Sequence, residues 1–501
     1  MPIELVFDSI LFMAKAKTQI PSSMDVDEVL TQVEKAIKED KTASPALISA
    51  VTMMVLLVKM LLGRLSLHSK NSSKAPSSDQ NKDKDEQENE NGDEKPKSGG
   101  QKGHKGTTLE LVDDPEEIKE LPVDQSTLPE GTYSIVGYER RQVVDIKISR
   151  FITEYRAQIL ENEQGKRITA SFPAGVTAPV QYGNSLKSNA VYMSQFQLIP
   201  YLRVKQHFQE VFGIEISVGS LYNFNETAYH RLEVFEDFGK QKLREEDVGH
   251  VDETGCNIDG KNHWIHDFSS TRWTILVPHE KRGCEAMDEI DILPHFKGVL
   301  CHDHWKPYFK YTQCEHALCN PHHIRELTYS SEQEKQEWAL KMKEFLLNLH
   351  QEVKSRDGWL AKERLEKVHA EYQEIIKEGE EECPPPKPPK EKKRGRLKKS
   401  KSRNLLERLK KYETETLLFA HRKEVPFSNN QGERDLRMTK VHQKISGCFR
   451  SFRGAQIFCR MRSYLGSMQK QGMNAGKAMD LLFSNKWGEF AKSGFSTENL
   501  T

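Results

Sequence analysis

Residues 246–330 carry a succession of strand and helix signals that restricts the fold more than any other part of the chain. Three short apolar runs, GHVDETGC, NHWIHDFSS and RWTILVPHE, are separated by turn residues at 259–262 and 269–271, a pattern typical of consecutive strands. A helical stretch from Cys284 to Leu293 follows, then two further strand-like runs, KGVLCHDHW and CEHALCN, and a helix that opens with HHIRELTY. This order predicts an α/β layer with a mixed sheet.

Two acids lie inside these apolar runs. Asp252 belongs to the run GHVDETG, and Asp303 lies near the end of the run GVLCHDHW. Strands normally bury hydrophobic side chains at such positions. A buried carboxylate is costly unless it is paired, protonated or bound to a metal. Two carboxylates on neighbouring strands repel each other unless a cation lies between them. Mg²⁺ fits such a place, because it prefers oxygen ligands and binds one or two carboxylates together with phosphates.

A third acid, Glu433, lies in the first turn of a basic C-terminal helix that starts at the helix-start residues Ser428–Asn430. It is the candidate that completes a site for two ions about 3.5–4 Å apart, the arrangement used for phosphoryl displacement. Each acid also has a plainer interpretation: Asp252 as a strand end, and Glu433 as a partner of its helix dipole. The neighbours Glu253 and Asp435 are alternative ligands.

The remaining chain divides by composition. Residues 45–68 form an apolar helix that is too uniformly hydrophobic for a solvated single helix. It either self-associates as a coil or packs on its own catalytic domain. The predicted order is an N-terminal helical oligomerisation segment (1–70), a disordered linker (71–106), a small β module (107–180), a helical region (181–245), a catalytic core (246–330 and 421–480), a helical insertion (331–420) and a C-terminal tail (481–501).

Within the helical region, VFGIEISVGSLYNFNETAYHRL resembles a helix–turn–helix with its turn at Gly213 and a helix start at Ser217. Such a unit can place a recognition helix in a DNA groove, and an ordinary helical hairpin is the alternative.

Local charge predicts a polyanionic partner, although the chain as a whole has 74 basic and 74 acidic residues. Ten Lys/Arg lie between Lys387 and Arg403 with one acid, and nine lie between Arg434 and Lys470 with one acid. Tracts this unbalanced favour contact with phosphates, and a solvated linker is the alternative for the first. The predicted DNA-binding residues are Lys392, Lys393, Arg394, Arg396, Lys398, Lys399, Arg434, Arg437, Lys440, Lys444, Arg450 and Arg453.

Composition excludes a polytopic membrane protein, since 36% of the residues are hydrophobic and 30% are charged. All eight cysteines lie at or after Cys256 in no disulfide-like framework, which predicts reduced thiols and a cytoplasmic setting. The N-terminus lacks a basic n-region and a cleavage site, so no signal peptide is expected. No membrane partner is expected either, because the apolar run at 50–62 is shorter than the roughly 20 residues of a spanning helix.

Several blocks occur in an order that resembles the transposases of the insertion-sequence-66 family: GRLSLHSKNSSKAPSSD, PKSGGQKGHKG, the stretch FPAGV to SLYNF, HVDETG, CHDHWKPY, HALCNPHHIRELTY and PFSNNQGERDLRMTKVHQKISGCFRS. The resemblance implies a ribonuclease-H-like core with an Asp-Asp-Glu triad. Asp252, Asp303 and Glu433 match its three acids. It further implies DNA at the bacterial nucleoid as the partner and accessory proteins encoded by the element. A homo-oligomer is expected because two DNA ends must meet.

Two features bear on zinc. Members of that family often have a cysteine zinc module before the FPAGV block, whereas this chain has no cysteine there. The second is CEHALCNPHH, whose irregular spacing is not that of a zinc site, so zinc is not expected at Cys314, His316, Cys319, His322 or His323. We instead expect Asn320, His322 and Arg325 near the active site, behind the metal ligands or at a phosphate.

The predicted function is DNA strand cleavage and strand transfer at the ends of a mobile element, with Mg²⁺ bound by Asp252, Asp303 and Glu433 and with Mn²⁺ able to replace it. One alternative is a catalytically silent DNA-binding protein derived from a transposase. The other is a scaffold built on the coil and the charged helices.

Overall fold

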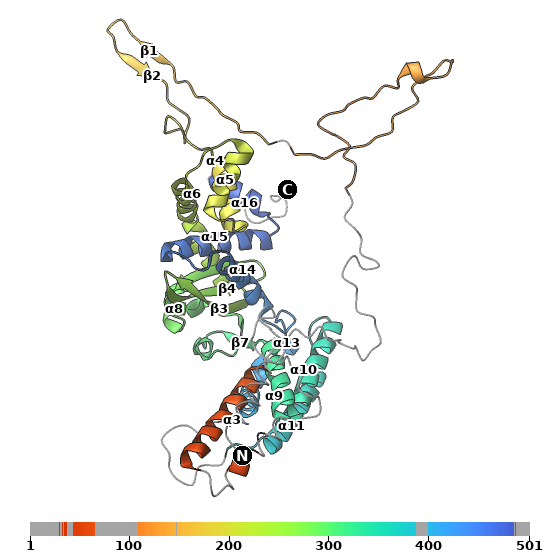
Figure 1. Cartoon of the computed structure of the whole chain (residues 1–501), viewed down its shortest axis with the longest axis vertical. Coiled ribbons are helices and arrows are strands. Elements are labelled where there is room, and N and C mark those ends of the chain that lie inside the picture. The colour runs from red at the N-terminus through yellow and green to blue at the C-terminus, as the bar shows by residue number, and fades with distance from the viewer. Residues whose placement is uncertain are drawn as a thin grey trace. The chain divides into compact units, whose positions relative to one another are not determined.

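The structure is a computed structural model of the chain (Figure 1). It describes residues 44–65, 109–146, 148–386 and 399–484, together with Lys486 and five single positions between 30 and 37. The predicted linker at 71–106 and most of the predicted tail at 481–501 lie outside the described residues. The chain divides into two compact units.

A five-stranded mixed sheet has the order β5-β4-β3-β6-β7, which confirms the α/β prediction. Its strands are β3 (Val248–Ile258), β4 (Lys261–Ser269), β5 (Thr274–His279), β6 (Val299–His302) and β7 (Glu315–Leu318). β4 and β5 are antiparallel, whereas β6 is parallel to both β3 and β7. The first residues of β3 belong to unit 1 with β6 and β7, and the rest of β3 belongs to unit 2 with β4 and β5.

The turn between β3 and β4 is the tightest that a hairpin allows. Only Asp259 and Gly260 separate the two strands, and both have positive φ, 49° and 77°. Positive φ at both central residues is the type I′ geometry, for which Asp-Gly is among the favoured pairs. The amide of Gly260 donates to Asn257 Oδ1 at 3.0 Å.

Unit 1 is mainly helical, and its core lies among helices from the stretch predicted as an insertion. Trp338, Leu346, Tyr372 and Leu406 are among its fully buried side chains. In Figure 1, α9, α10 and α11 lie side by side, and α10 contacts both α9 and α11. The helices of this unit are α3 (Pro45–Leu65), α9 (Asn320–Glu334), α10 (Glu337–Ser355), α11 (Lys362–Glu382), α12 (Lys401–Lys411) and α13 (Glu413–His421), with a 3₁₀ turn at Lys306–Lys310.

Unit 2 packs helices on the antiparallel part of the sheet. Its helices are α4 (Asn184–Val191), α5 (Tyr201–Phe212), α6 (Val218–Arg231), α7 (Glu233–Arg244), α8 (Cys284–Ile290), α14 (Asn430–Ser446), α15 (Phe452–Lys470) and α16 (Ala475–Phe483), with a π-helical turn at Tyr192–Phe196 and 3₁₀ turns at Gln125–Thr127 and Leu293–His295.

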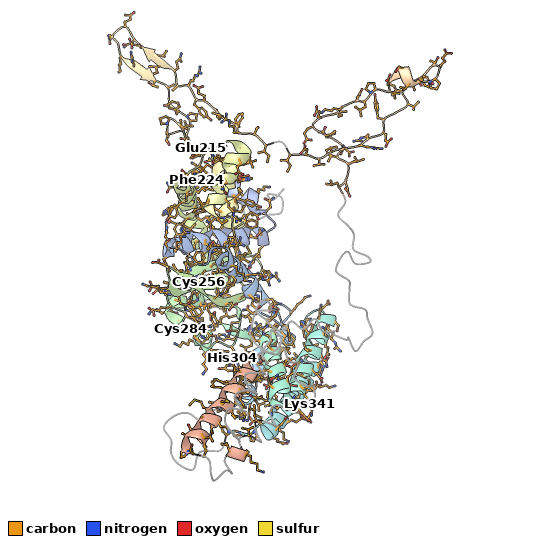
Figure 2. All side chains as sticks on the ribbon, viewed as in Figure 1. Glu215, Phe224, Cys256, Cys284, His304 and Lys341 are labelled. Atoms are coloured by element: carbon orange, nitrogen blue, oxygen red, sulfur yellow. The ribbon has the colours of Figure 1, made fainter. Side chains whose placement is uncertain are left out.

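One face of the sheet is covered by α14 and α15. Cys256 and Ile258 of β3 and Ile265 of β4 form a buried cluster with Leu436 of α14 and Phe458 of α15; Cys256 is labelled in Figure 2. The edge strand β5 is also covered, because its backbone amides at 274 and 276 donate to serine hydroxyls of α15. Such cover protects an edge that could otherwise pair with another chain.

The two helices predicted on either side of Gly213 are present as α5 and α6, an arrangement that both a helix–turn–helix and an ordinary helical hairpin share. Gly213 ends α5 in the left-handed conformation with φ 63°, and its amide donates to Gln209 O and Phe208 O. Ser217 caps α6 by accepting a hydrogen bond from the Ser220 amide at 2.9 Å. Whether α6 reads DNA stays a prediction.

The stretch predicted as a β module contains one hairpin among its described residues, formed by β1 (Ile159–Glu161) and β2 (Arg167–Thr169). Large apolar side chains such as Val136, Val143 and Phe151 are more than 90% exposed. The described part of 107–180 buries almost none of its alternating apolar side chains. It therefore does not form a module with a core of its own.

Helix α3 buries Val55 but leaves most of its apolar side chains about half exposed or more. They are Leu47, Met53, Met54, Leu56, Leu57, Met60 and Leu61. In the described residues, no helix combines the length and the apolarity that crossing a bilayer requires.

Candidate active site

The first predicted acid, Asp252, lies in β3 close to where β3 pairs with β6. His250 lies opposite Cys301 in the parallel register of these strands, and Asp252 and Asp303 each follow two residues later. The Asp252 carboxyl is half-buried and accepts a hydrogen bond from the amide of Glu253 at 2.9 Å.

The alternative ligand Glu253 is engaged elsewhere. Its Oε1 accepts two hydrogen bonds from Arg282, at 2.8 Å from Nε and 2.6 Å from Nη2. The Glu253 side chain is only 3% exposed, and the Arg282 guanidinium also stacks on the Trp264 ring, 4.7 Å from its centroid. This pair with a buried carboxylate would have to break before Glu253 Oε1 could bind a metal.

Asp303 directly follows β6 in unit 1. Its Oδ1 accepts a hydrogen bond from the amide of Trp305 at 2.8 Å, which fixes the carboxyl in a tight turn. Burial lowers the pKa of Arg408, and the nearby negative charge of Asp303 opposes that shift. Burial lowers the pKa of His304 to about 4 and that of His302 to about 3, so both rings beside Asp303 are neutral at pH 7.

Glu433, the third predicted acid, lies half-buried in the first turn of α14. Leu436 and Lys440 follow at three and seven residues, on the same side of the helix. Leu436 packs in the cluster against the sheet, and Lys440 Nζ donates to Gly255 O of β3 at 2.9 Å. The side of α14 that carries Glu433 therefore faces β3.

Asp435, the other alternative ligand, is held by a lysine. Its Oδ2 accepts from Lys470 Nζ at 2.6 Å, from Thr274 Oγ1 at 3.0 Å and from Gln431 Nε2 at 2.9 Å. The side chains of Asp435 and Lys470 are each 13% exposed. This pair ties α14 and α15 to β5.

The sequence reasoning missed Asp267, an acid in β4 that is 3% exposed. Burial raises the pKa of Asp267 well above its usual range, and the nearby carboxylates of Asp435 and Asp252 raise it further. The positive charge of Lys470 and the hydrogen bond from the Ser269 hydroxyl lower this pKa but do not cancel the rise. The signal that singled out Asp252, an acid inside an apolar strand, is equally present in HWIHDFSS.

The residues predicted to lie behind the metal ligands lie on α9 in unit 1. Asn320 is 1% exposed, and its Nδ2 donates to Thr416 O at 3.0 Å, so its amide anchors α9 to α13. Burial lowers the pKa of His322 to about 4, and the positive charge of Arg325 contributes to this shift. His322 is therefore neutral at pH 7, and a role near a phosphate stays a prediction for these three residues.

Two of the cysteines and histidines of CEHALCNPHH have partners elsewhere in unit 1. Cys314 donates to Tyr311 O, and His316 Nδ1 lies 3.0 Å from His302 Nε2. Across the part of the chain that the structure describes, no three of these five side chains bring ligand atoms within 4.8 Å of one another. Tyr308, which lies near these residues in the sequence, is 2% exposed and belongs to the core.

The predicted DNA-binding residues differ in their availability. Lys392, Lys393, Arg394, Arg396 and Lys398 lie outside the described residues. Three others have partners in the protein: Lys399 pairs with Glu407, Lys440 with Gly255 O, and Arg453 with Glu226 and the Tyr229 ring. Besides Lys440, the exposed members among the described residues are Arg434, Arg437, Lys444 and Arg450.

The fold and the acids define an α/β protein with carboxylates on the face of a mixed sheet. The model of the Transposase IS66 family matches residues 179–457, which include Asp252, Asp303 and Glu433. The match covers more than half of the chain, so the chain belongs to this family, whose members are DNA-cleaving enzymes in general. Residues 19–110 match a family of unknown function, DUF6444. No curated protein matches the chain significantly.

Proposed function

We propose that the chain is a transposase that cleaves DNA at the ends of an insertion sequence and joins the freed 3′ end to target DNA. In this proposal Asp252, Asp303 and Glu433 hold Mg²⁺ or Mn²⁺, and the sheet is the ribonuclease-H-like core that the family resemblance implies.

The register of β3 and β6 carries the proposal. His250 and Cys301 are paired, and Asp252 and Asp303 come two residues later on strands that run in the same direction. The register therefore supports one carboxylate within β3 and a second directly after β6, the strand that pairs with the start of β3. The packing of Leu436 and Lys440 against β3 supports Glu433 as the third.

The acids fit a hard divalent cation because all three offer carboxylate oxygens. Such a cation would lower the pKa of a bound water and neutralise charge on the scissile phosphate. The alternative acids Glu253 and Asp435 already have a cation of the protein as partner. The task of the chain is to hold the carboxylates and the DNA in position.

The chemistry needs no external energy source. In cleavage, a water oxygen bonds to phosphorus and the bond from phosphorus to the 3′ oxygen breaks. That oxygen gains a proton, which leaves a 3′-hydroxyl and a 5′-phosphate. In strand transfer this hydroxyl attacks a phosphodiester of the target, so one ester bond forms for each that breaks.

Duplex DNA would be held by exposed cations of α14 and by the helix–turn–helix. Arg434, Arg437 and Lys444 are exposed, and their spacing of three and seven residues places them on one side of α14. Contacts from such a side position the phosphate backbone rather than read bases.

A second copy of the chain is the proposed partner of α3, because two DNA ends must be brought together. Leu47, Met54 and Leu61 recur every seven residues and are each about half exposed, the spacing of a coiled-coil seam. Met54→Lys, in the middle of this seam, is expected to lower the molar mass measured by light scattering toward that of a monomer. Thr52→Lys, on the same helix and also exposed, is the control and should not change it. Accessory proteins of the element remain part of the proposal by resemblance alone.

The decisive test measures nicking of duplex DNA that carries the ends of the element that encodes this chain. Wild type should nick it with Mg²⁺ and not with EDTA, and Asp252→Asn should lose the activity. Asp237→Asn, which alters an exposed acid of α7, should retain it. Equal nicking by wild type and Asp252→Asn would refute the proposal, and binding without nicking by wild type would favour the catalytically silent alternative.

A further inference from the structure

The hairpin of β3 and β4 determines which residue of β4 lies beside Asp252. With only Asp259 and Gly260 in the turn, Ile258 pairs with Lys261. Counting six residues back along β3 and six forward along β4 brings Asp252 opposite Asp267. Directly opposite residues in an antiparallel pair have Cβ atoms about 4.5–5.5 Å apart.

Both acids lie on the face that α14 and α15 cover. Cys256 and Ile258 in β3 and Ile265 in β4 belong to the buried cluster with these helices. Asp252 is an even number of residues from the first two, and Asp267 is two residues from Ile265, so the alternation of strands puts both acids on this same face. It is also the face toward which α14 presents Glu433.

Asp267 has an oxygen that its own surroundings do not satisfy. Its Oδ2 accepts from the Ser269 hydroxyl at 2.9 Å, whereas its Oδ1 is buried and has no hydrogen-bond partner among the residues that the structure describes. A buried polar atom without a partner is costly and calls for a specific reason.

The nearest lysine cannot supply the missing partner. Lys470 Nζ already donates to Asp435 Oδ2 at 2.6 Å and to Thr274 Oγ1 at 2.5 Å, and it also contacts the carbonyl oxygens of Ser270 and Trp273 at 2.8 and 3.0 Å. An ammonium group has three hydrogens, and all of them have acceptors here. Asp435, the neighbouring carboxylate, is itself an acceptor.

On the basis of the proposed function, we propose that Asp267 is a fourth carboxylate of the cation site and binds the divalent ion through Oδ1 together with Asp252. A hard cation that prefers oxygen ligands is the partner that suits an unsatisfied carboxyl oxygen beside a second carboxylate. The site then draws ligands from both strands of one hairpin as well as from α14.

The test measures Mn²⁺ binding to the full-length chain without DNA, from the loss of the free Mn²⁺ signal in electron paramagnetic resonance. Asp267→Asn keeps the shape of the side chain and should weaken Mn²⁺ binding about tenfold or more. Asp252→Asn should weaken it at least as much, and Asp237→Asn should leave it unchanged. Circular dichroism and the melting temperature without metal report whether each variant is folded.

A second variant tests ligation directly. In Asp267→Cys the new thiolate is a soft ligand, so the variant should bind Cd²⁺ more tightly than wild type does and Mg²⁺ more weakly. The inference is wrong if Asp267→Asn binds Mn²⁺ as wild type does, if folded Asp267→Cys gains no affinity for Cd²⁺, or if both variants are unfolded without metal. A loss of binding in Asp252→Asn but not in Asp267→Asn would overturn this inference and leave the proposed function intact.

Discussion

Replacement of Lys470 by methionine should destabilise unit 2 strongly, because this ammonium is the one cation among the described residues that hydrogen-bonds Asp435. The two side chains are each 13% exposed and lie 2.6 Å apart. The substitution leaves a buried carboxylate with only Thr274 and Gln431 as hydrogen-bond donors. Breaking a buried pair by removing one partner costs about 3–5 kcal/mol.

The magnitude translates into a shift that urea unfolding can resolve. With a denaturant dependence of about 3 kcal/mol/M, the midpoint of Lys470→Met should fall by about 1–2 M. Tryptophan fluorescence reports on this unit, since Trp264 and Trp273 lie in its sheet region. Lys341→Met, which removes an exposed pair with Glu378, is the matched control and should leave the midpoint unchanged.

Adding Asp435→Asn to Lys470→Met should recover part of the loss, because the double variant no longer buries an uncompensated charge. The expected coupling is about 1–3 kcal/mol. The interpretation of Asp435 as a structural acid is refuted if Lys470→Met shifts the urea midpoint by less than a third of the expected amount. It is also refuted if the double variant has a lower midpoint than Lys470→Met alone. Asp435→Asn alone should leave Mn²⁺ binding unchanged, unlike Glu433→Gln.

Three further predictions follow from single sites. Burial lowers the pKa of His442 to about 4, so the unfolded chain takes up a proton first as the pH falls below about 6.5. The titration of His442 should therefore lower the free energy of unfolding by about 1–2 kcal/mol between pH 7 and pH 5. In His442→Phe the urea midpoint should depend less on pH over this range. Arg434→Ala with Arg437→Ala should weaken DNA binding at all sequences and reduce the slope of log affinity against log salt by about 2, while Lys367→Ala, in the helical unit, should not. Gly379→Ala should cost about 1–3 kcal/mol in thermal or urea unfolding, because the added Cβ would lie 2.7 Å from a leucine methyl and 3.1 Å from a tryptophan ring; an unchanged midpoint would contradict the packing described around it.

Local signals predicted the five-stranded sheet well, because its strands are short and separated by strong turn residues. Asp259 and Gly260 adopt the turn that an Asp-Gly pair favours, and Gly213 and Ser217 end and begin helices as their residue types suggest. The stretch 107–180 shows the limit of the same reasoning. Its apolar alternation is typical of strands, but alternation alone does not supply a second layer to bury them against.

Long-range partners were beyond the reach of sequence reasoning. The pairing of Asp435 with Lys470 joins two helices across 35 residues, and that of Glu253 with Arg282 joins residues 29 apart. Nothing in either local pattern indicates which cation serves which acid. Asp267 was within reach, because the two-residue turn alone fixes its register with Asp252 once both strands are accepted.

Counter-charge is what distinguishes the acids of unit 2 from one another. Glu253 and Asp435 each have a cation of the chain within 2.6 Å, so a metal would have to displace an arginine or a lysine to bind there. The hydrogen-bonding capacity of Lys470 is already used, and Asp267 keeps a buried oxygen that no group of the described residues satisfies. Removing the arginine should therefore convert Glu253 into a competing ligand: Arg282→Met is expected to add a second, weaker class of Mn²⁺ sites to the binding isotherm. An unchanged isotherm for this variant would show that the geometry of β3, and not the counter-charge, excludes Glu253 from the metal.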